Sequence, residues 1–301
     1  MIEFQDRVAI VTGAGGGLGK AYATLLASRG AAVVVNDLGG SVHGEGEDAT
    51  TADTVVAEIE AAGGTAVADY HTVAEPKGGA AIVETALDNF GRVDILINNA
   101  GILRDKTLAK MEWNDLDAVL DVHLKGAFYV SQPAFNQMKE QEYGRIIMTS
   151  SASGMFGNFG QSNYGAAKAG VFGLMNVLKL EGAKYGITVN AICPIAQTRM
   201  TTEILGEMAD KADPGSVAPA VAYLVSAECD LSGDVWSIGA GSVSRIFTSL
   251  APGYFKHPEE DGPISIEDVA EHVDDIRVEE DYIVPFSSRD EFAKLGPMLF
   301  S

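Results

Sequence analysis

The side chains that point most directly to chemistry are a tyrosine and a lysine four positions apart, Tyr164 and Lys168. Residues with this spacing share one face of a helix, so the two side chains can meet. A phenol with a pKa of about 10 is a poor base at neutral pH. A neighbouring ammonium group favours the phenolate and lowers that pKa. The pair therefore predicts a site that moves a proton, although the same spacing also arises by chance.

The residues just before this pair give it a context. Thr149, Ser150 and Ser151 follow an apolar run that predicts a strand over 145–149. In a doubly wound sheet, ligands bind in the crevice outside the carboxyl ends of the strands. We therefore expect the Ser151 hydroxyl to lie in the same crevice as Tyr164.

A glycine-rich turn lies between the first predicted strand, 8–11, and the first predicted helix, 21–27. Glycines let the backbone turn tightly and approach a pyrophosphate, and the helix N-terminus adds unpaired N–H groups and a positive dipole end. A plain turn is the alternative. The cofactor-binding residues predicted in this segment are Gly13, Gly15, Gly17, Leu18 and Gly19.

Asp37 ends the second predicted strand, where a carboxylate can bind an adenosine ribose and repel a 2′-phosphate. No arginine stands immediately beside it, so the sequence favours NAD over NADP. The alternative is a simple turn residue before Gly39. Asn99, Ala100 and Gly101 follow the fourth predicted strand. Small residues and turn formers at this position are typical of the ligand-binding crevice, and the alternative is a loop that stabilises the sheet.

Short apolar runs alternate with longer helical patterns along residues 1–248. Continuously apolar strands are typical of a sheet covered by helices on both faces. Strand–helix alternation implies parallel pairing. We therefore predict an α/β fold with one doubly wound, Rossmann-type parallel sheet of about seven strands. The predicted strands are 8–11, 32–35, 65–68, 93–97, 145–149, 188–192 and 235–238, and the predicted helices are 21–27, 54–62, 80–90, 113–138, 164–185 and 219–227.

Residues 249–301 form an acidic C-terminal extension with a helical pattern. Ser265 and Asp268 resemble a capping box at a helix N-terminus. The apolar residues that follow, at 266, 269, 273 and 276, recur at helical spacing. We expect an amphipathic helix that packs on the body of the protein or on a partner subunit.

The net charge of −21 disfavours nucleic acid as a partner, because a phosphate backbone would be repelled. The two cysteines, Cys193 and Cys229, show no metal-type spacing, and no metal site is predicted. No apolar run approaches the roughly 20 residues of a membrane span, so no membrane association is expected. The start of the chain lacks a signal-peptide pattern, and its end is not a peroxisomal address. These features favour the cytoplasm.

The motifs together resemble those of the short-chain dehydrogenase/reductase family, and they occur in that family's order. They are Thr-Gly-x3-Gly-x-Gly at 12–19, Asn-Asn-Ala-Gly at 98–101, Ser151, and Tyr-x3-Lys at 164–168. The resemblance covers about residues 5–248 and is highly specific as a set.

Two positions depart from the general family pattern and narrow the match. His123 stands where the family usually has asparagine, and Ile195 follows Pro194 where glycine is usual. Residues 36–40, 101–105 and 144–161 look like the (3R)-hydroxyacyl-CoA dehydrogenase unit of peroxisomal type-two multifunctional β-oxidation enzymes, a unit also described as a 17β-hydroxysteroid dehydrogenase. We expect a bacterial stand-alone relative, because the hydratase and sterol-carrier units are absent from this chain.

The resemblance implies roles for particular residues. Tyr164 would take the hydroxyl proton of the substrate, and Ser151 would orient the substrate oxygen. Lys168 would lower the tyrosine pKa and bind the nicotinamide ribose, and both Tyr164 and Lys168 would contact the cofactor. His123 would replace the asparagine in a proton path to solvent, unless it is simply a buried helix histidine. Predicted cofactor contacts elsewhere are His71, Val73, Pro194, Ile195 and Thr198. Predicted substrate contacts are Ser151, Tyr164, Arg104 and Arg199, with apolar lining from Met155, Phe156, Phe159 and Met200.

The predicted function is therefore NAD-dependent oxidation of the 3-hydroxy group of a (3R)-hydroxyacyl-CoA, fatty or carrying a steroid side chain. A 17β-hydroxysteroid dehydrogenase and a 3-oxoacyl-carrier-protein reductase are the enzymatic alternatives. A dinucleotide-sensing protein without catalysis is the alternative of another class, and such a protein would usually have lost Ser151, Tyr164 or Lys168. We expect a homodimer or homotetramer.

Overall fold

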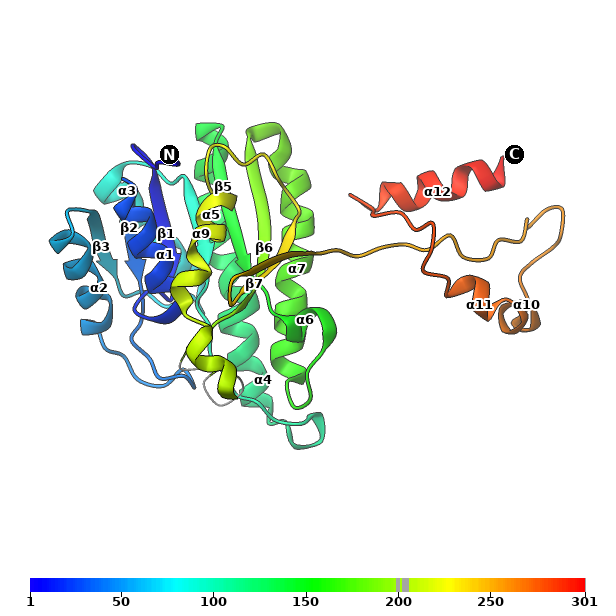
Figure 1. The fold of residues 1–301 in the computed structure, drawn as a ribbon, viewed down its shortest axis with the longest axis horizontal. Helices are drawn as coiled ribbons and strands as arrows, with labels where there is room; N and C mark the ends of the chain where they lie inside the picture. The colour runs from blue at the N-terminus through cyan, green and yellow to red at the C-terminus, as the bar shows by residue number, and fades with distance from the viewer. Residues whose placement is uncertain (199–200, 202–205, 301) are drawn as a thin grey trace. The chain divides into compact units, whose positions relative to one another are not determined.

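The computed structural model describes residues 1–198, 201 and 206–300. The chain divides into two compact units, residues 1–245 and 246–301. The first unit carries the strands and most of the helices (Figure 1).

One eight-stranded sheet organises the first unit, in the order β3-β2-β1-β4-β5-β6-β7-β8. Strands β1 to β7 pair in parallel with their neighbours. This confirms the predicted doubly wound parallel sheet. The strands are β1 Val8–Thr12, β2 Ala32–Asn36, β3 Thr65–Asp69, β4 Ile95–Asn98, β5 Gly144–Thr149, β6 Ile187–Ile195, β7 Val235–Gly239 and β8 Ser242–Ile246.

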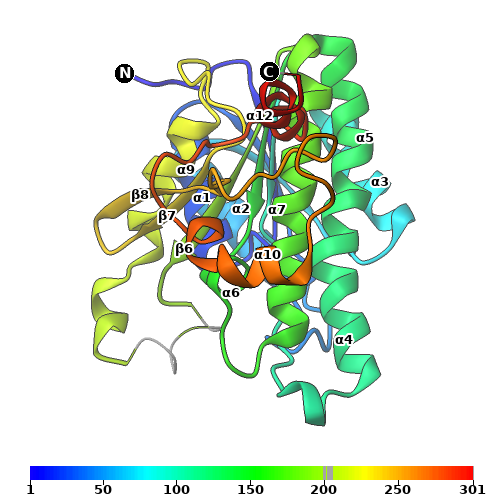
Figure 2. The same cartoon turned by 90° about the vertical axis from the view of Figure 1, so that its right-hand side faces the viewer.

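Helices cover both faces of this sheet, as the continuously apolar strands require. Figure 2 shows α1 and α9 on one side and α5 and α7 on the other. The α-helices of this unit are α1 Gly17–Ser28, α2 Thr50–Ala61, α3 Pro76–Phe90, α4 Trp113–Leu120, α5 Gly126–Gln141, α6 Ala152–Phe156, α7 Ser162–Gly182 and α9 Ala218–Leu224. Short 3-10 turns lie at Leu108–Lys110, Ala183–Tyr185, Gly206–Lys211 and Pro214–Ser216.

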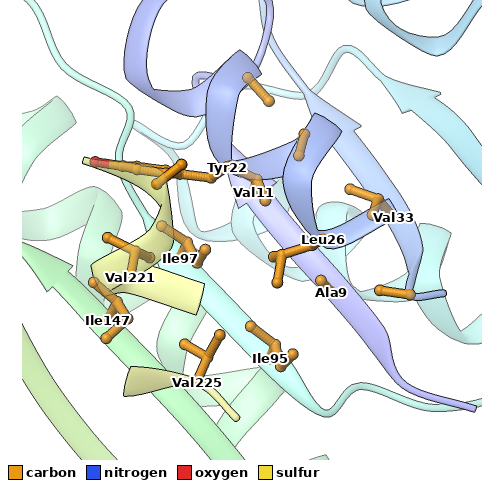
Figure 3. Packing of buried hydrophobic residues seen from close by; sticks show 14 of the residues in the cluster. Ala9, Val11, Tyr22, Leu26, Val33, Ile95, Ile97, Ile147, Val221 and Val225 are labelled. Atoms are coloured by element: carbon orange, nitrogen blue, oxygen red, sulfur yellow. The ribbon is translucent and has the colours of Figure 1, made fainter. Parts of the chain in front are cut away.

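The core between α1, α9 and the sheet is tightly packed (Figure 3). Leu26 of α1 and Val221 of α9 are each 1% exposed, and Ile97 of β4 and Ile147 of β5 between them are fully buried. Burying each such side chain contributes about 1.5–3 kcal/mol. This packing fixes the strands, and with them the loops at the carboxyl edge of the sheet.

The sheet has one strand more than predicted. β7 and β8 are joined by Ala240 and Gly241, which both have positive φ, 48° and 81°. Two left-handed residues make the tight turn of an antiparallel hairpin. The β8 side chains are mostly exposed, so the strand lacks the apolar run by which the other strands were predicted.

The long helix predicted over 113–138 is interrupted. A π-helical turn over Asp121–Lys125 separates α4 from α5 and places His123 in the interior, 4% exposed. Such turns insert one extra residue and are frequent at functional sites. Apolar periodicity could not predict it, because the pattern continues almost unchanged through the turn.

Over residues 246–300 the structure has three short helices, α10 Ile266–Glu271, α11 Val273–Ile276 and α12 Arg289–Leu299. The predicted capping box is present, with Ser265 and Asp268 exchanging hydrogen bonds at the start of α10. The predicted single helix is instead broken at His272, between α10 and α11. No described side chain over 246–300 is buried, so packing on another surface stays a prediction. None of the described helices is long and apolar enough to cross a membrane.

Candidate active site

Residues that follow six different strands, β1 to β6, gather around one cleft of about 610 Å³ at the carboxyl edge of the sheet. The volume lies within the usual range for small-molecule sites. The predicted residues that line it are Gly13, Gly17, Leu18, Asp37, His71, Val73, Asn99, Ala100, Gly101, Arg104, His123, Ser151, Tyr164, Lys168, Pro194, Ile195 and Thr198.

The glycine-rich turn shapes the floor of this cleft. Gly13 has a φ of +65°, and a Cβ there would lie 2.8 Å from the Ala100 Cα atom. A Cβ on Gly19 would meet the Gly13 carbonyl oxygen at 2.2 Å, so both positions require glycine. No side chain caps the N-terminus of α1 at Gly16, where a Cβ would face open space. Backbone N–H groups in this arrangement fit a phosphate.

Asp37 is held in place by the backbone around it. One carboxylate oxygen accepts from the Gly15 N–H (2.7 Å) and the other from the Gly39 N–H (2.7 Å). A carboxylate has about four acceptor positions, so two remain for a ligand. Gly15 thus lies behind Asp37 rather than on the cleft surface, and it orients the carboxylate.

Lys168 lies beneath the cleft, 4% exposed. Its Nζ donates a hydrogen bond to the Thr149 carbonyl oxygen at 2.6 Å, and the Ser150 hydroxyl donates to the Lys168 carbonyl oxygen at 2.8 Å. Loss of hydration lowers the pKa of Lys168 to about 7. The amine can therefore bind or release a proton at neutral pH.

Tyr164 sits beside this amine, with Lys168 Nζ 5.6 Å from the centre of its ring. Burial raises the pKa of Tyr164 to about 12, and a hydrogen bond with the Ser151 hydroxyl opposes the rise. The sequence led us to expect a lowered tyrosine pKa in this pair. Burial is instead the largest influence on the Tyr164 pKa, and it outweighs the hydrogen bond with Ser151.

His123 completes the group, with its ring 5.2 Å from that of Tyr164 and nearly perpendicular to it. Its Nε2 lies 3.0 Å from the Ile102 nitrogen and 2.8 Å from the Ile102 oxygen. Burial, together with Lys168, lowers the pKa of His123 well below its usual value, so the ring is neutral. The histidine is thus buried, as one reading of the sequence expected.

The other ring nitrogen of His123 is not satisfied. Nδ1 is buried without a hydrogen-bond partner in the described part of the chain, and so is the Thr149 hydroxyl. Both residues and Lys168 line a small chamber of about 10 Å³. That volume corresponds to about one water molecule, and polar walls favour hydration.

Arg104 lines the cleft but already has partners. Its Nε donates to the His43 carbonyl oxygen at 2.9 Å, and its Nη1 lies 3.5 Å from an Asp115 carboxylate oxygen. A phosphate group of a CoA substrate would have to compete with the Asp115 carboxylate for the Arg104 guanidinium. Arg199 and Met200 lie outside the described residues. Phe156 and Phe159 are exposed and do not line the cleft, so the apolar wall expected from them is not formed.

Sequence reasoning missed the loop after β2. Residues 38, 40–42 and 44 line the cleft, and Val42 accepts from the Leu103 N–H at 2.9 Å. His43 Nδ1 also lies 2.9 Å from the Leu103 carbonyl oxygen. The cluster of Gly39, Gly40 and Gly44 was a signal for a tightly turning loop at the crevice.

Comparisons with known proteins agree with this geometry. A family model described as short chain dehydrogenase matches residues 7–209. A Mycobacterium tuberculosis protein described as a putative short-chain type dehydrogenase/reductase is 53% identical over 267 residues, covering 88% of this chain and 92% of that protein. Peroxisomal multifunctional enzyme type 2 of Drosophila melanogaster is 50% identical, covering 88% of this chain but 44% of that enzyme.

Two solved structures are also similar. Full-length peroxisomal multifunctional enzyme type 2 from Drosophila melanogaster matches with a TM-score of 0.83 and 40% identity, over 99% of this chain and 50% of that chain. A 7α-hydroxysteroid dehydrogenase complexed with NADH and 7-oxo glycochenodeoxycholic acid matches with a TM-score of 0.71 and 28% identity, over 80% of this chain and 96% of that chain.

Burial of the Lys168 amine should cost stability in a pH-dependent way. The unfolded chain binds this proton below pH 10.5, whereas the folded protein binds it only below about pH 7. Between these values the unfolded state holds more protons, so wild-type stability rises with pH. Lys168→Met should therefore stabilise the protein by about 2–5 kcal/mol at pH 7 and below. That gain should disappear as the pH approaches 10.5.

Urea unfolding of both proteins from pH 6 to 10 measures the difference. Lys77→Met, at an exposed lysine, is the matched control and should leave the free energy of unfolding nearly unchanged across the range. A constant difference between wild type and Lys168→Met across this range would contradict the lowered lysine pKa.

Proposed function

Because the chain belongs to the short-chain dehydrogenase family, as its motifs predicted, we propose that this oxidoreductase is NAD-dependent and oxidises (3R)-hydroxyacyl-CoA thioesters. The observation that carries the proposal is the group of Ser151, Tyr164 and Lys168 in a single cleft with Asp37. A base, its proton partner and a ribose-binding carboxylate are what a dinucleotide-dependent alcohol oxidation needs.

The residues around the glycine-rich turn fit a dinucleotide, since the uncapped N-terminus of α1 and the space at Gly16 leave room for a pyrophosphate. When bound, NAD supplies the hydride acceptor. Tyr164 accepts the hydroxyl proton of the substrate as its own phenolic proton passes toward the Lys168 amine, and Ser151 holds the substrate oxygen by a hydrogen bond. Lys168, with its pKa of about 7, receives and passes on a proton at neutral pH.

His123 provides the next step of the proton path in this proposal. A water in the chamber of about 10 Å³ would pair with His123 Nδ1 and the Thr149 hydroxyl, next to the Lys168 amine. The neutral ring at Nδ1 offers a lone pair when Nε2 donates to the Ile102 carbonyl oxygen. The chamber thus connects the lysine to a second proton acceptor.

The substrate class is supported by the relatives and by the cleft. The resemblance of residues 36–40 and 101–105 to the (3R)-hydroxyacyl-CoA dehydrogenase unit of multifunctional β-oxidation enzymes supports an acyl-CoA substrate. The solved 7α-hydroxysteroid dehydrogenase complex makes a hydroxysteroid the second candidate. The cleft volume of about 610 Å³ lies in the range of small-molecule sites and supports a small-molecule substrate. We also expect a homodimer or homotetramer, in the cytoplasm.

Cofactor choice should depend on Asp37. Asp37→Ala should lower kcat/KM with NAD and raise it with NADP, changing their ratio by about 10- to 100-fold, because a charged acceptor and a repulsion are both lost. Asp37→Asn is the control, since it keeps the side-chain shape and removes the charge. If the wild-type protein already prefers NADP, the assignment of Asp37 is wrong.

Loss of the His123 ring should slow proton transfer. His123→Ala should lower kcat by about tenfold or more, most strongly below about pH 7, where Lys168 keeps its proton. His123→Asn should recover much of the loss, because an amide can also bind the water. Profiles of kcat against pH decide the question. An equal loss at every pH with a lower Tm would instead indicate a purely structural histidine.

Stereochemistry tests the substrate assignment. The wild-type protein with NAD should oxidise (3R)-hydroxyacyl-CoAs with a kcat/KM at least about 100-fold above that for the (3S) epimers. Free 17β-hydroxysteroids should be weaker substrates. Preference for the (3S) epimer, or a higher kcat/KM for the steroids, would overturn the acyl-CoA assignment and leave the family assignment intact.

A further inference from the structure

Gln161, the residue before α7, is a buried polar side chain that lines the cleft and that the proton chemistry does not use. It is 6% exposed. Its Nε2 donates to an Asp105 carboxylate oxygen at 2.6 Å, and its Oε1 accepts from the Ser153 hydroxyl at 2.7 Å and from Asn158 Nδ2 at 3.0 Å. A single backbone bridge also pairs Gln161 with Lys106. The loop that carries Asp105 is therefore held beside the start of α7.

These contacts determine the orientation of the Gln161 amide. An ionised carboxylate can only accept, so Asp105 requires the amide nitrogen on its side and the oxygen on the other. That oxygen has two acceptor positions, and Ser153 and Asn158 fill both as donors. Asp105 is exposed and does not line the cleft, so it acts on the cleft through Gln161.

The atoms that remain for a ligand form a complementary pair. A serine hydroxyl has one proton, and because Ser153 gives it to Gln161, only its lone pairs remain for a ligand. An amide nitrogen has two protons, so Asn158 Nδ2 keeps one N–H. Ser153 and Asn158 both line the cleft. An acceptor beside a donor matches an amide group of a ligand, whose N–H donates and whose carbonyl oxygen accepts.

The pair lies next to the hydroxyl that holds the substrate oxygen in the proposed function. Ser153 belongs to the first turn of α6, and its N–H donates to Ser151 Oγ at 3.2 Å. In a 3-hydroxyacyl thioester of CoA, the secondary alcohol is followed by the thioester carbonyl, the sulfur, a short ethylene spacer and an amide. A substrate that places its alcohol at Ser151 and extends along α6 therefore brings this amide toward Ser153.

We propose that Ser153 and Asn158 recognise the amide nearest the sulfur of a CoA thioester. The Ser153 hydroxyl accepts from the amide N–H, and Asn158 Nδ2 donates to the amide carbonyl oxygen. Gln161 is the positioning residue that orients both side chains, and Asp105 orients Gln161. The inference rests on the proposed acyl-CoA substrate and identifies the part of it that the cleft recognises. A 17β-hydroxysteroid has no such amide, so the contact favours the thioester.

Two synthetic thioesters that differ in one group test the contact. The first is the (3R)-hydroxybutyryl thioester of N-acetylcysteamine, which keeps the amide. In the second, 2-mercaptoethyl acetate replaces N-acetylcysteamine, so an ester oxygen takes the place of the amide N–H. Steady-state oxidation with NAD gives kcat and KM for each. The wild-type protein should prefer the amide by at least about tenfold in kcat/KM, mainly through KM, because the ester sets an acceptor against the lone pairs of Ser153.

Substitutions separate recognition from positioning. Ser153→Ala removes the acceptor, so the preference should fall to about twofold or less. Gln161→Leu releases the Ser153 proton, which can then point to the ester oxygen, so the preference should fall in this variant as well. The double substitution Asp105→Asn, Gln161→Glu should restore the preference, because a carboxamide then donates to a carboxylate that again accepts from Ser153 and Asn158. Ser162→Ala, at an exposed serine that does not line the cleft, is the matched control and should keep the wild-type ratio.

The outcomes distinguish this inference from the proposed function. If the wild-type protein oxidises both synthetic thioesters equally well, or if Ser153→Ala and Gln161→Leu leave the ratio unchanged, the inference fails and the proposed function stands. If the CoA thioester is oxidised but neither synthetic thioester is, the amide contributes too little to binding and the inference also fails. If no thioester is oxidised while free hydroxysteroids are, both proposals fall. A correctly folded double variant that does not regain the ratio would contradict the positioning role of Asp105.

Discussion

The buried amine of Lys168 is the constraint on which the rest of the site depends. An amine removed from water needs hydrogen-bond partners, and the Thr149 carbonyl oxygen at the end of β5 supplies one at 2.6 Å. The Ser150 hydroxyl ties the same strand end to the backbone of α7. Packing of α7 against β5 and β6 therefore fixes the lysine beneath Tyr164, and the resulting desolvation lowers the lysine pKa while raising that of the tyrosine. The chamber lined by His123 and the π-helical turn that carries His123 lie next to the same buried amine.

Hydrogen bonds between neighbouring strand ends hold several polar side chains of the cleft in place. Asp37 is fixed by the Gly15 and Gly39 N–H groups, and Asn99 Nδ2 donates to the Thr12 and Gly13 carbonyl oxygens. Asp69 fixes His71 in the same way. In each case a polar side chain forms hydrogen bonds to the backbone or to another side chain. These bonds orient the polar groups of Asp37 and His71 that face the cleft. Such preorganisation lowers the cost of binding and orienting a ligand.

The sequence was sufficient for the parallel sheet and for the residues that gather at its edge, because both follow from local patterns. Apolar runs identify strands covered on two sides, and glycines identify close backbone approaches such as Gly13 on Ala100. It was not sufficient for features that depend on packing. The π-helical turn at His123 leaves the apolar period nearly intact. The direction of the Tyr164 pKa follows from burial, which no spacing reveals. The contact between Asp69 and His71 joins two residues of which the sequence had indicated only His71. From the sequence Arg104 is an unpaired cation, and only the structure shows that Asp115 lies beside it.

In the proposed function, the phenolic oxygen of Tyr164 takes the substrate proton as it passes its own proton to the Lys168 amine. Tyr164→Phe removes this oxygen and little else, so steady-state turnover and NAD binding should be measured together on the same preparation. The account predicts a kcat lower by about 100- to 10,000-fold with the affinity for NAD within about twofold of wild type. A kcat close to that of the wild-type protein would contradict it.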